Sequence, residues 1–129
     1  MGLFDALTVS GSGLSAERLR MDTTAENLAN AQTPGYRRKE VVVQESFDQT
    51  LGKAMGVEAV GIQQDPTANR RVYDPGNPSA DAQGYVSQPN ISTVTEMVDL
   101  ISASRGYEAN VTAMQTAKQM FSRTLDILR

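Results

Sequence analysis

The C-terminal stretch Thr93–Leu128, TVTEMVDLISASRGYEANVTAMQTAKQMFSRTLDIL, decides the fold. Apolar residues recur in it at a spacing of seven, and no proline interrupts it. A sustained pattern of this kind predicts one helix, roughly 50 Å long, whose apolar seam packs as a coiled coil. Thr93 and Glu96 match a capping box, which predicts a helix start at Thr93. Gly106 lies inside this helix at a cost of up to about 1 kcal/mol, and it indicates either a close helix contact or a weak spot.

A second seven-residue pattern runs along the N-terminal segment. Here the small residues of Gly11-Ser12-Gly13 predict a break, with a short first helix and a second one beginning near Leu14. Pro34 and Gly35 predict a sharp end to this helical segment, because proline disfavours helix at the residue before it. The predicted assembly interface consists of the large apolar residues of both patterns: Leu7, Leu14, Met21, Leu28, Met97, Leu100, Tyr107, Val111, Met114, Phe121, Leu125 and Leu128.

The segment between the two helices is polar and rich in turn residues. Its stretch KEVVVQESF is β-branched and predicts a strand, and shorter strands are expected at Val60–Gln63, Arg71–Tyr73 and Gly84–Ser87. The intervening Asp, Pro, Asn and Gly residues favour turns. This segment has too few large apolar residues for a core of its own, so we expect a small β-hairpin module.

The sequence therefore predicts a mainly α fold with a small β portion, in which long N- and C-terminal helices pair as a coiled coil around a small β-hairpin module. The expected units are residues 1–33, 34–91 and 92–129. Two helices paired in one chain bury only one side each, which offsets little of the entropy lost on ordering. The ends therefore indicate an assembly device, although two ordinary amphipathic helices of a small bundle would carry a similar pattern.

Composition restricts the chemistry that the chain can perform. It contains no Cys and no His, which removes disulfides, thiolate nucleophiles and the usual zinc ligands. Asp74, Asn77 and Asp81 do not have the spacing of a calcium loop and are interpreted as turn residues. No pairing of a nucleophile with a base is visible, so we expect neither an enzyme nor a bound cofactor or metal.

Charge and hydropathy restrict the partners. The net charge of −3 argues against a nucleic-acid partner. The two basic clusters, Arg37–Lys39 and Arg70–Arg71, are interpreted as solvated loop charges. No run approaches the ~18 apolar residues of a membrane span, so we expect no direct membrane insertion.

Two stretches resemble a known family. ENLANAQTPGYRRKEVVVQ, from residue 26 to 44, resembles the N-terminal signature of bacterial flagellar axial proteins, the group of rod, hook and hook-associated proteins. The longer stretch Tyr73–Met120 is similar to the proximal-rod branch of this family, in particular through DPGNPSADAQGYV and the following PN. Together the two stretches cover well over half of the chain. Gly106 departs from the family pattern, which usually has a larger residue there.

The resemblance implies a structural subunit of the flagellar basal-body rod. Its terminal helices would polymerise in the inner layer of a helical tube, and the β module would lie outside. Subunits of this family are exported by the flagellar type III apparatus and form the torque-transmitting drive shaft in the periplasmic space. The implied partners are copies of the same chain, other proximal and distal rod proteins, the ring–rod junction protein and the export apparatus. The family motif falls on Asn27, Leu28, Ala29, Asn30, Thr33, Pro34, Gly35, Tyr36, Ser104, Arg105, Tyr107, Glu108 and Asn110.

Two other interpretations remain open from the residues alone. A coiled-coil adaptor of fixed small stoichiometry would also show two heptad stripes. Another structural component secreted by a type III apparatus, such as a needle or translocator protein, would show similar helical ends.

Overall fold

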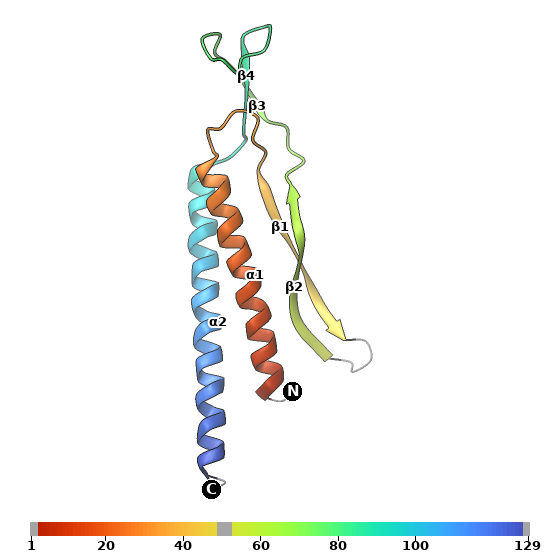
Figure 1. Ribbon diagram of the computed structural model, residues 1–129, viewed down its shortest axis with the longest axis vertical. Helices are drawn as coiled ribbons and strands as arrows, with labels where there is room; N and C mark the ends of the chain where they lie inside the picture. The colour runs from red at the N-terminus through yellow and green to blue at the C-terminus, as the bar shows by residue number, and fades with distance from the viewer. Residues whose placement is uncertain (1–2, 49–52, 128–129) are drawn as a thin grey trace.

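The computed structural model describes residues 3–48 and 53–127. Its elements follow one another along the chain as α1 (Leu3–Ala29), β1 (Lys39–Asp48), β2 (Lys53–Gln64), β3 (Arg70–Tyr73), β4 (Tyr85–Gln88) and α2 (Thr93–Ile127). The two helices are antiparallel and lie side by side, and α1 lies between α2 and the β1–β2 hairpin (Figure 1). Both chain ends point to one end of the molecule, and β3 and β4 lie at the other (Figure 1). The prediction of a mainly α fold with a small β portion is confirmed.

The predicted break of the N-terminal helix at Gly11-Ser12-Gly13 is wrong, because α1 is continuous through this segment. The three small residues serve instead to let neighbours approach. A Cβ atom on Gly11 would lie 3.6 Å from Met114 Cε, and one on Gly13 would lie 2.9 Å from Asn110 Nδ2, so both glycines face α2. Ser12 faces the hairpin and accepts a 3.1 Å hydrogen bond from the Val57 backbone N–H.

The long C-terminal helix is confirmed, with an N-cap one residue earlier than the capping box implied. Ser92 is the cap, since its hydroxyl accepts a hydrogen bond from the Thr95 N–H at 3.4 Å and its carbonyl accepts one from the Glu96 N–H at 3.0 Å. The capping box predicted at Thr93 is therefore wrong. Glu96 is one position too far along the helix for that role, and its carboxylate is used elsewhere.

The β1–β2 hairpin runs from the Lys39↔Gln64 pair to the Asp48↔Lys53 pair. The strand expected at KEVVVQESF is confirmed as β1, whereas β2 is much longer than the predicted Val60–Gln63. Gly56 explains why this longer strand reaches α1. It adopts a φ of +108°, and a Cβ there would come within 3.2 Å of the Val9 Cα, so only glycine permits the contact.

The second hairpin pairs β3 with β4 from Arg70↔Gln88 to Tyr73↔Tyr85, which confirms both of the short strands expected there. Val86 is 1% exposed and packs on the inner face of this small sheet. The segment between the helices thus forms two separate two-stranded sheets. One lies along α1 and the other caps the far end of the helix pair (Figure 1).

The buried part of the chain is small and partly polar. Among the described residues, the buried apolar side chains are Ala16, Val86, Pro89 and Ala103. The buried polar ones are Thr23, Thr24, Asn27 and Glu96. In the described part of the chain, no helix is long and apolar enough to cross a membrane.

Candidate functional site: the helix exit and the two faces of α2

The turn after α1 directs the chain out of the helix pair. Asn30 Nδ2 donates a hydrogen bond to the Glu26 carbonyl at 2.9 Å, and the Thr33 N–H donates to the Asn30 carbonyl at 3.0 Å. Gly35 has a φ of +79°, which favours glycine over other residues. Its N–H donates to the Ser87 carbonyl at 2.9 Å, which ties the exit to β4.

Asn27 connects three segments that are far apart in the sequence. It is 1% exposed. Its Oδ1 accepts hydrogen bonds from the Tyr36 hydroxyl at 3.0 Å and the Lys39 N–H at 2.9 Å. Its Nδ2 donates to the Lys39 carbonyl at 2.8 Å and to Glu96 Oε2 at 3.2 Å. All four hydrogen-bonding positions of the amide are therefore used, and α1, β1 and α2 meet at one side chain.

Glu96 is the acidic partner in this network, which we call the exit lock (Asn27, Tyr36, Arg38, Lys39 and Glu96). Its carboxylate is almost fully buried and lies 2.6 Å from Arg38 Nε. That hydrogen bond is the main reason why the pKa of Arg38 is raised. Burial, together with the negative charges of Glu26 and Glu96, raises the pKa of the Tyr36 hydroxyl, which therefore stays protonated as a donor to Asn27.

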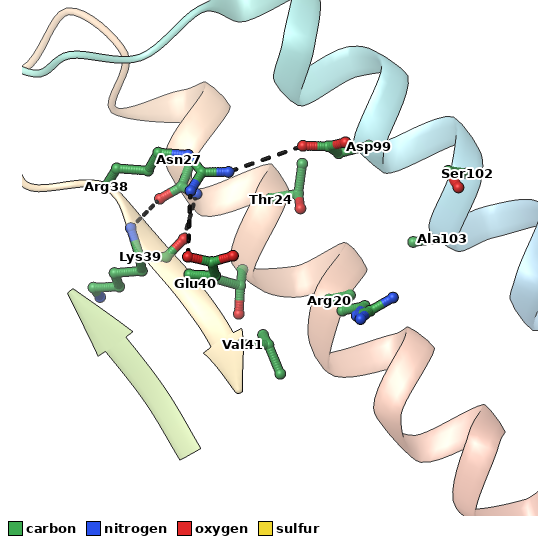
Figure 2. A pocket seen from close by; sticks show the side chains of 11 residues that line it. Arg20, Thr24, Asn27, Arg38, Lys39, Glu40, Val41, Asp99, Ser102 and Ala103 are labelled. Carbon is green, nitrogen blue, oxygen red and sulfur yellow. Dashed lines mark hydrogen bonds and ion pairs between the residues drawn. The ribbon is translucent and has the colours of Figure 1, made fainter. Parts of the chain in front are cut away.

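A polar cavity of about 260 Å³ lies beside the exit lock. Figure 2 shows it bounded by Arg20 and Thr24 of α1, by Glu40 and Val41 of β1, and by Asp99, Ser102 and Ala103 of α2. In residues 3–48 and 53–127, no group of three or more Asp, Glu, His or Cys is placed to hold a metal ion. The contacts within this site position helices and strands.

The most buried positions on the face of α2 that meets α1 are small or polar, and the larger Leu100, Val111 and Met114 are half-buried beside them. Ala103 and, on α1, Ala16 are each 5% exposed. A Cβ on Gly106 would lie 3.1 Å from Glu17 Cδ. Gly106 therefore marks a close helix contact, the first of the two alternatives that the sequence left open. Glu96, Ala103, Asn110 and Ala117 follow one another at a spacing of seven along this face and are buried or half-buried.

This series could not be found from the spacing of large apolar residues, because two of its members are Ala and the other two are polar. The available signal was the coincidence of small residues on both helices. Close helix packing needs such residues on both partners.

The opposite face of α2 carries large apolar residues in water. Near its start, Val94, Met97, Val98 and Ile101 are 54–71% exposed, at the i, i+3, i+4, i+7 spacing of one helical face. We call these four residues the outer strip. Towards the end of the helix, Met120, Leu125 and Ile127 are also more than half exposed. Exposed polar residues, among them Arg105, Glu108 and Gln115, separate the two groups, and the compact outer strip marks an interaction surface.

The residues of the predicted assembly interface divide between these two environments. Those that are half-buried within the chain are Leu7, Leu14, Met21, Leu28, Leu100, Val111 and Met114. Those that are exposed are Met97, Tyr107, Phe121 and Leu125. Leu128 lies outside the described residues.

The family motif also divides into two parts. Its N-terminal part forms the exit turn and supplies Asn27 and Tyr36 to the exit lock. In its C-terminal part, Asn110 packs against Gly13, whereas Arg105, Tyr107 and Glu108 are exposed on α2.

Known proteins with similar sequences are flagellar. The family model described as flagella basal body rod protein matches residues 7–37, and the one described as the C-terminal part of flagellar basal body rod FlgEFG proteins matches residues 82–127. The flagellar basal-body rod protein FlgC of Bacillus subtilis is 43% identical, over 98% of this chain and 99% of the relative. FlgC of Yersinia enterocolitica is 41% identical and that of Salmonella typhimurium 40%, each over 98% of both chains.

Proposed function

The chain belongs to the FlgC family of flagellar basal-body rod proteins, and we propose that its terminal helices complete their burial only against neighbouring subunits of the rod. It is a structural subunit of the rod, located in the flagellar basal body, where it associates with other rod components. The exposed apolar face of α2 is the observation that supports burial between subunits.

The size of the core supports this reading. Four small or medium apolar side chains are buried in the described chain, while the four residues of the outer strip are exposed to water. Since each residue of the outer strip is 54–71% exposed, covering it would contribute roughly 1–2 kcal/mol. The most strongly apolar part of α2 therefore stabilises the assembled state more than the single chain.

In the proposed assembly, residues 1–33 and 92–129 form the inner layer of the tube, and residues 34–91 lie further out. The assembly interface includes the exposed residues Met97, Tyr107, Phe121 and Leu125. The half-buried members of the predicted interface would then serve mainly to pair α1 with α2.

The remaining steps of the proposal concern delivery and mechanical work. The subunit is exported by the flagellar type III apparatus, joins proximal and distal rod proteins and the ring–rod junction protein in the periplasmic space, and transmits torque. It performs no catalysis. The exit lock supports the mechanical role, because it ties both helices to the start of β1 through buried hydrogen bonds.

Complementation tests this function. In a motile host that lacks its own copy of the gene, the wild-type chain is expected to restore basal bodies with complete rods, visible by electron microscopy, and swimming. Complete rods in the host without any copy would refute the assignment.

The purified chain provides a second test. Its helical circular dichroism is expected to rise with concentration or on addition of a partner rod protein. A discrete dimer or trimer whose helicity is independent of concentration would instead indicate a coiled-coil adaptor.

A further inference from the structure

The two basic clusters of the sequence meet at one surface, at the end of the molecule opposite the chain termini. Arg37 leaves the exit turn and Arg71 lies on β3, and both line an open hollow of about 630 Å³ together with Asn69 and Tyr85. Figure 1 places β3 and β4 beyond the ends of both helices. This surface lies away from the contact between the two helices and is open to a neighbouring molecule.

The two arginines of the hollow differ in whether a carboxylate neutralises their charge. Arg71 pairs with Asp81, and its guanidinium lies 4.8 Å from the centre of the Tyr85 ring. Arg37 is exposed and has neither a hydrogen bond nor an ion pair in the described part of the chain. An exposed cation without a counter-charge, beside an arginine that is already held in place, favours a carboxylate ligand.

The same face of the β3–β4 sheet also carries aromatic area. Tyr73 is 64% exposed and Tyr85 39%, and their rings meet edge to face at 5.2 Å between centroids. The turn below is rigid, since Asp81 Oδ1 accepts hydrogen bonds from the N–H groups of Gln83 at 3.0 Å and Tyr85 at 2.9 Å. Exposed Tyr and Arg on a rigid support are the side chains that dominate protein interfaces. We call this surface the basic-aromatic surface; it comprises Arg37, Arg71, Tyr73 and Tyr85.

We propose that the basic-aromatic surface binds an acidic segment of an adjacent rod subunit. The proposal rests on the proposed function, which supplies the neighbour. It commits to protein carboxylates because the chain as a whole carries a net charge of −3 and offers one uncompensated cation here, too little for a nucleic acid or an anionic membrane. The tyrosine rings would cover the chain on either side of the carboxylate, and Arg37 would fix its register.

Charge reversal at Arg37 tests the proposal in the full chain, by complementation. Arg37→Glu is expected to reduce the number of complete rods per cell at least about tenfold, because it places like charges face to face. Arg37→Lys should stay within about twofold of wild type, since it keeps the charge. Arg70→Glu is the matched control. Arg70 precedes Arg71 on β3, so its side chain leaves the opposite face of the sheet. It should also stay within about twofold.

Rod numbers for Arg37→Glu equal to those for Arg70→Glu would overturn the proposal and leave the rod function intact. Failure of the wild-type gene to restore rods would instead remove the proposed function itself. Equal export of all variants into the medium or periplasm, measured by immunoblot, ensures that rod counts report assembly.

Selection for motility in the Arg37→Glu strain identifies the partner. The expected second-site changes replace Asp or Glu by Lys, Arg or a neutral residue in a rod subunit. Changes confined to Asp81 or other residues of this hollow, or reversion of position 37 alone, would count against an intermolecular carboxylate.

Discussion

The two faces of α2 differ from those of a helix that packs only within its own chain, because large apolar residues are found on both: Leu100 and Met114 are half-buried, while the outer strip lies in water. The face that meets α1 carries Ala103 at 5% exposure and Glu96 at 1%, whereas the face turned to water carries Val94 at 71% and Ile101 at 55%. A helix selected for the stability of its own chain would place the large apolar residues inside. The difference indicates that pairing within the chain and packing between chains use different chemistry on one helix.

The inner face brings the two helices close together and fixes their alignment. Glycine and alanine let the two helix backbones approach, and the exit lock accepts one antiparallel alignment because each of its polar atoms needs its own partner. The outer strip provides exposed apolar surface, which a complementary apolar surface of a neighbouring subunit can cover.

The substitution with the largest expected effect changes the outer strip alone and distinguishes assembly from the stability of the single chain. Ile101→Asp should leave the stability of the isolated chain within about 0.5 kcal/mol, since the side chain is exposed, yet it should abolish rod assembly by burying an unpaired charge between subunits. Complementation with rod counting measures the second effect, and urea unfolding followed by circular dichroism measures the first. Gln115→Asp, on a polar part of α2, is the control and should assemble. Complete rods from Ile101→Asp would show that the outer strip is not an interface.

Glu96→Ala should have the next largest effect, this time within the chain. It removes the closest ionic partner of Arg38, which keeps Asp65 at 3.6 Å, and one partner of the buried Asn27 amide, so we expect a loss of about 1–3 kcal/mol. A lower urea midpoint of the helical signal would report it. Glu40→Ala provides the control, because that carboxylate is 65% exposed and lies 3.9 Å from Arg38. Equal effects of the two substitutions would contradict the exit lock.

Ala103→Leu tests how closely the inner face is packed, because it adds side-chain volume at the contact between the helices. Overpacking a close helix contact costs about 1–3 kcal/mol, so the helix pair should loosen. Val98→Leu on the outer strip adds similar bulk at a position that is 60% exposed and should change stability by less than about 0.5 kcal/mol. Thermal unfolding of the two variants side by side measures the difference. Tolerance of leucine at position 103 would mean that the inner face is not closely packed.

The smallest effect should arise outside both faces, at Asp81. The N–H of Tyr85 is the main cause that lowers the pKa of Asp81 below its usual 3.8. A depressed pKa stabilises the fold above that usual value, and the contribution is lost as the pH falls through the lower, folded value. The amide shift of Tyr85 should therefore titrate below pH 3.8, and Asp81→Asn should remove this titration while α2 stays helical. A Tyr85 amide that titrates unchanged in the variant would contradict this assignment.

Much of the fold could be predicted from residues that act locally. The β-branched KEVVVQESF became β1, and the uninterrupted heptads became α2. The turn residues around Pro34 and Pro75 separated the elements as expected. In each case the signal and the structure concern neighbours along the chain.

The contacts between distant segments were the part that could not be predicted. Glu96 matched a capping box, but its carboxylate accepts a hydrogen bond from Arg38, 58 residues away. Gly11 and Gly13 suggested a break because glycine weakens an isolated helix, and their packing role depends on Asn110 and Met114 of the other helix. Met114 is consequently a poor probe of assembly alone, since it also packs within the chain.

The separation of Asn27 from Glu96 has a consequence for the order of folding. These residues are 69 positions apart, and bringing such distant points together costs about 4 kcal/mol of loop-closure entropy. By contrast, α1 and the β1–β2 hairpin are consecutive and can associate early. In a chain that becomes free to fold from its N-terminus onwards, α1 can therefore pack against the hairpin first. The register between α1 and α2 is set only when the last quarter of the polypeptide becomes available.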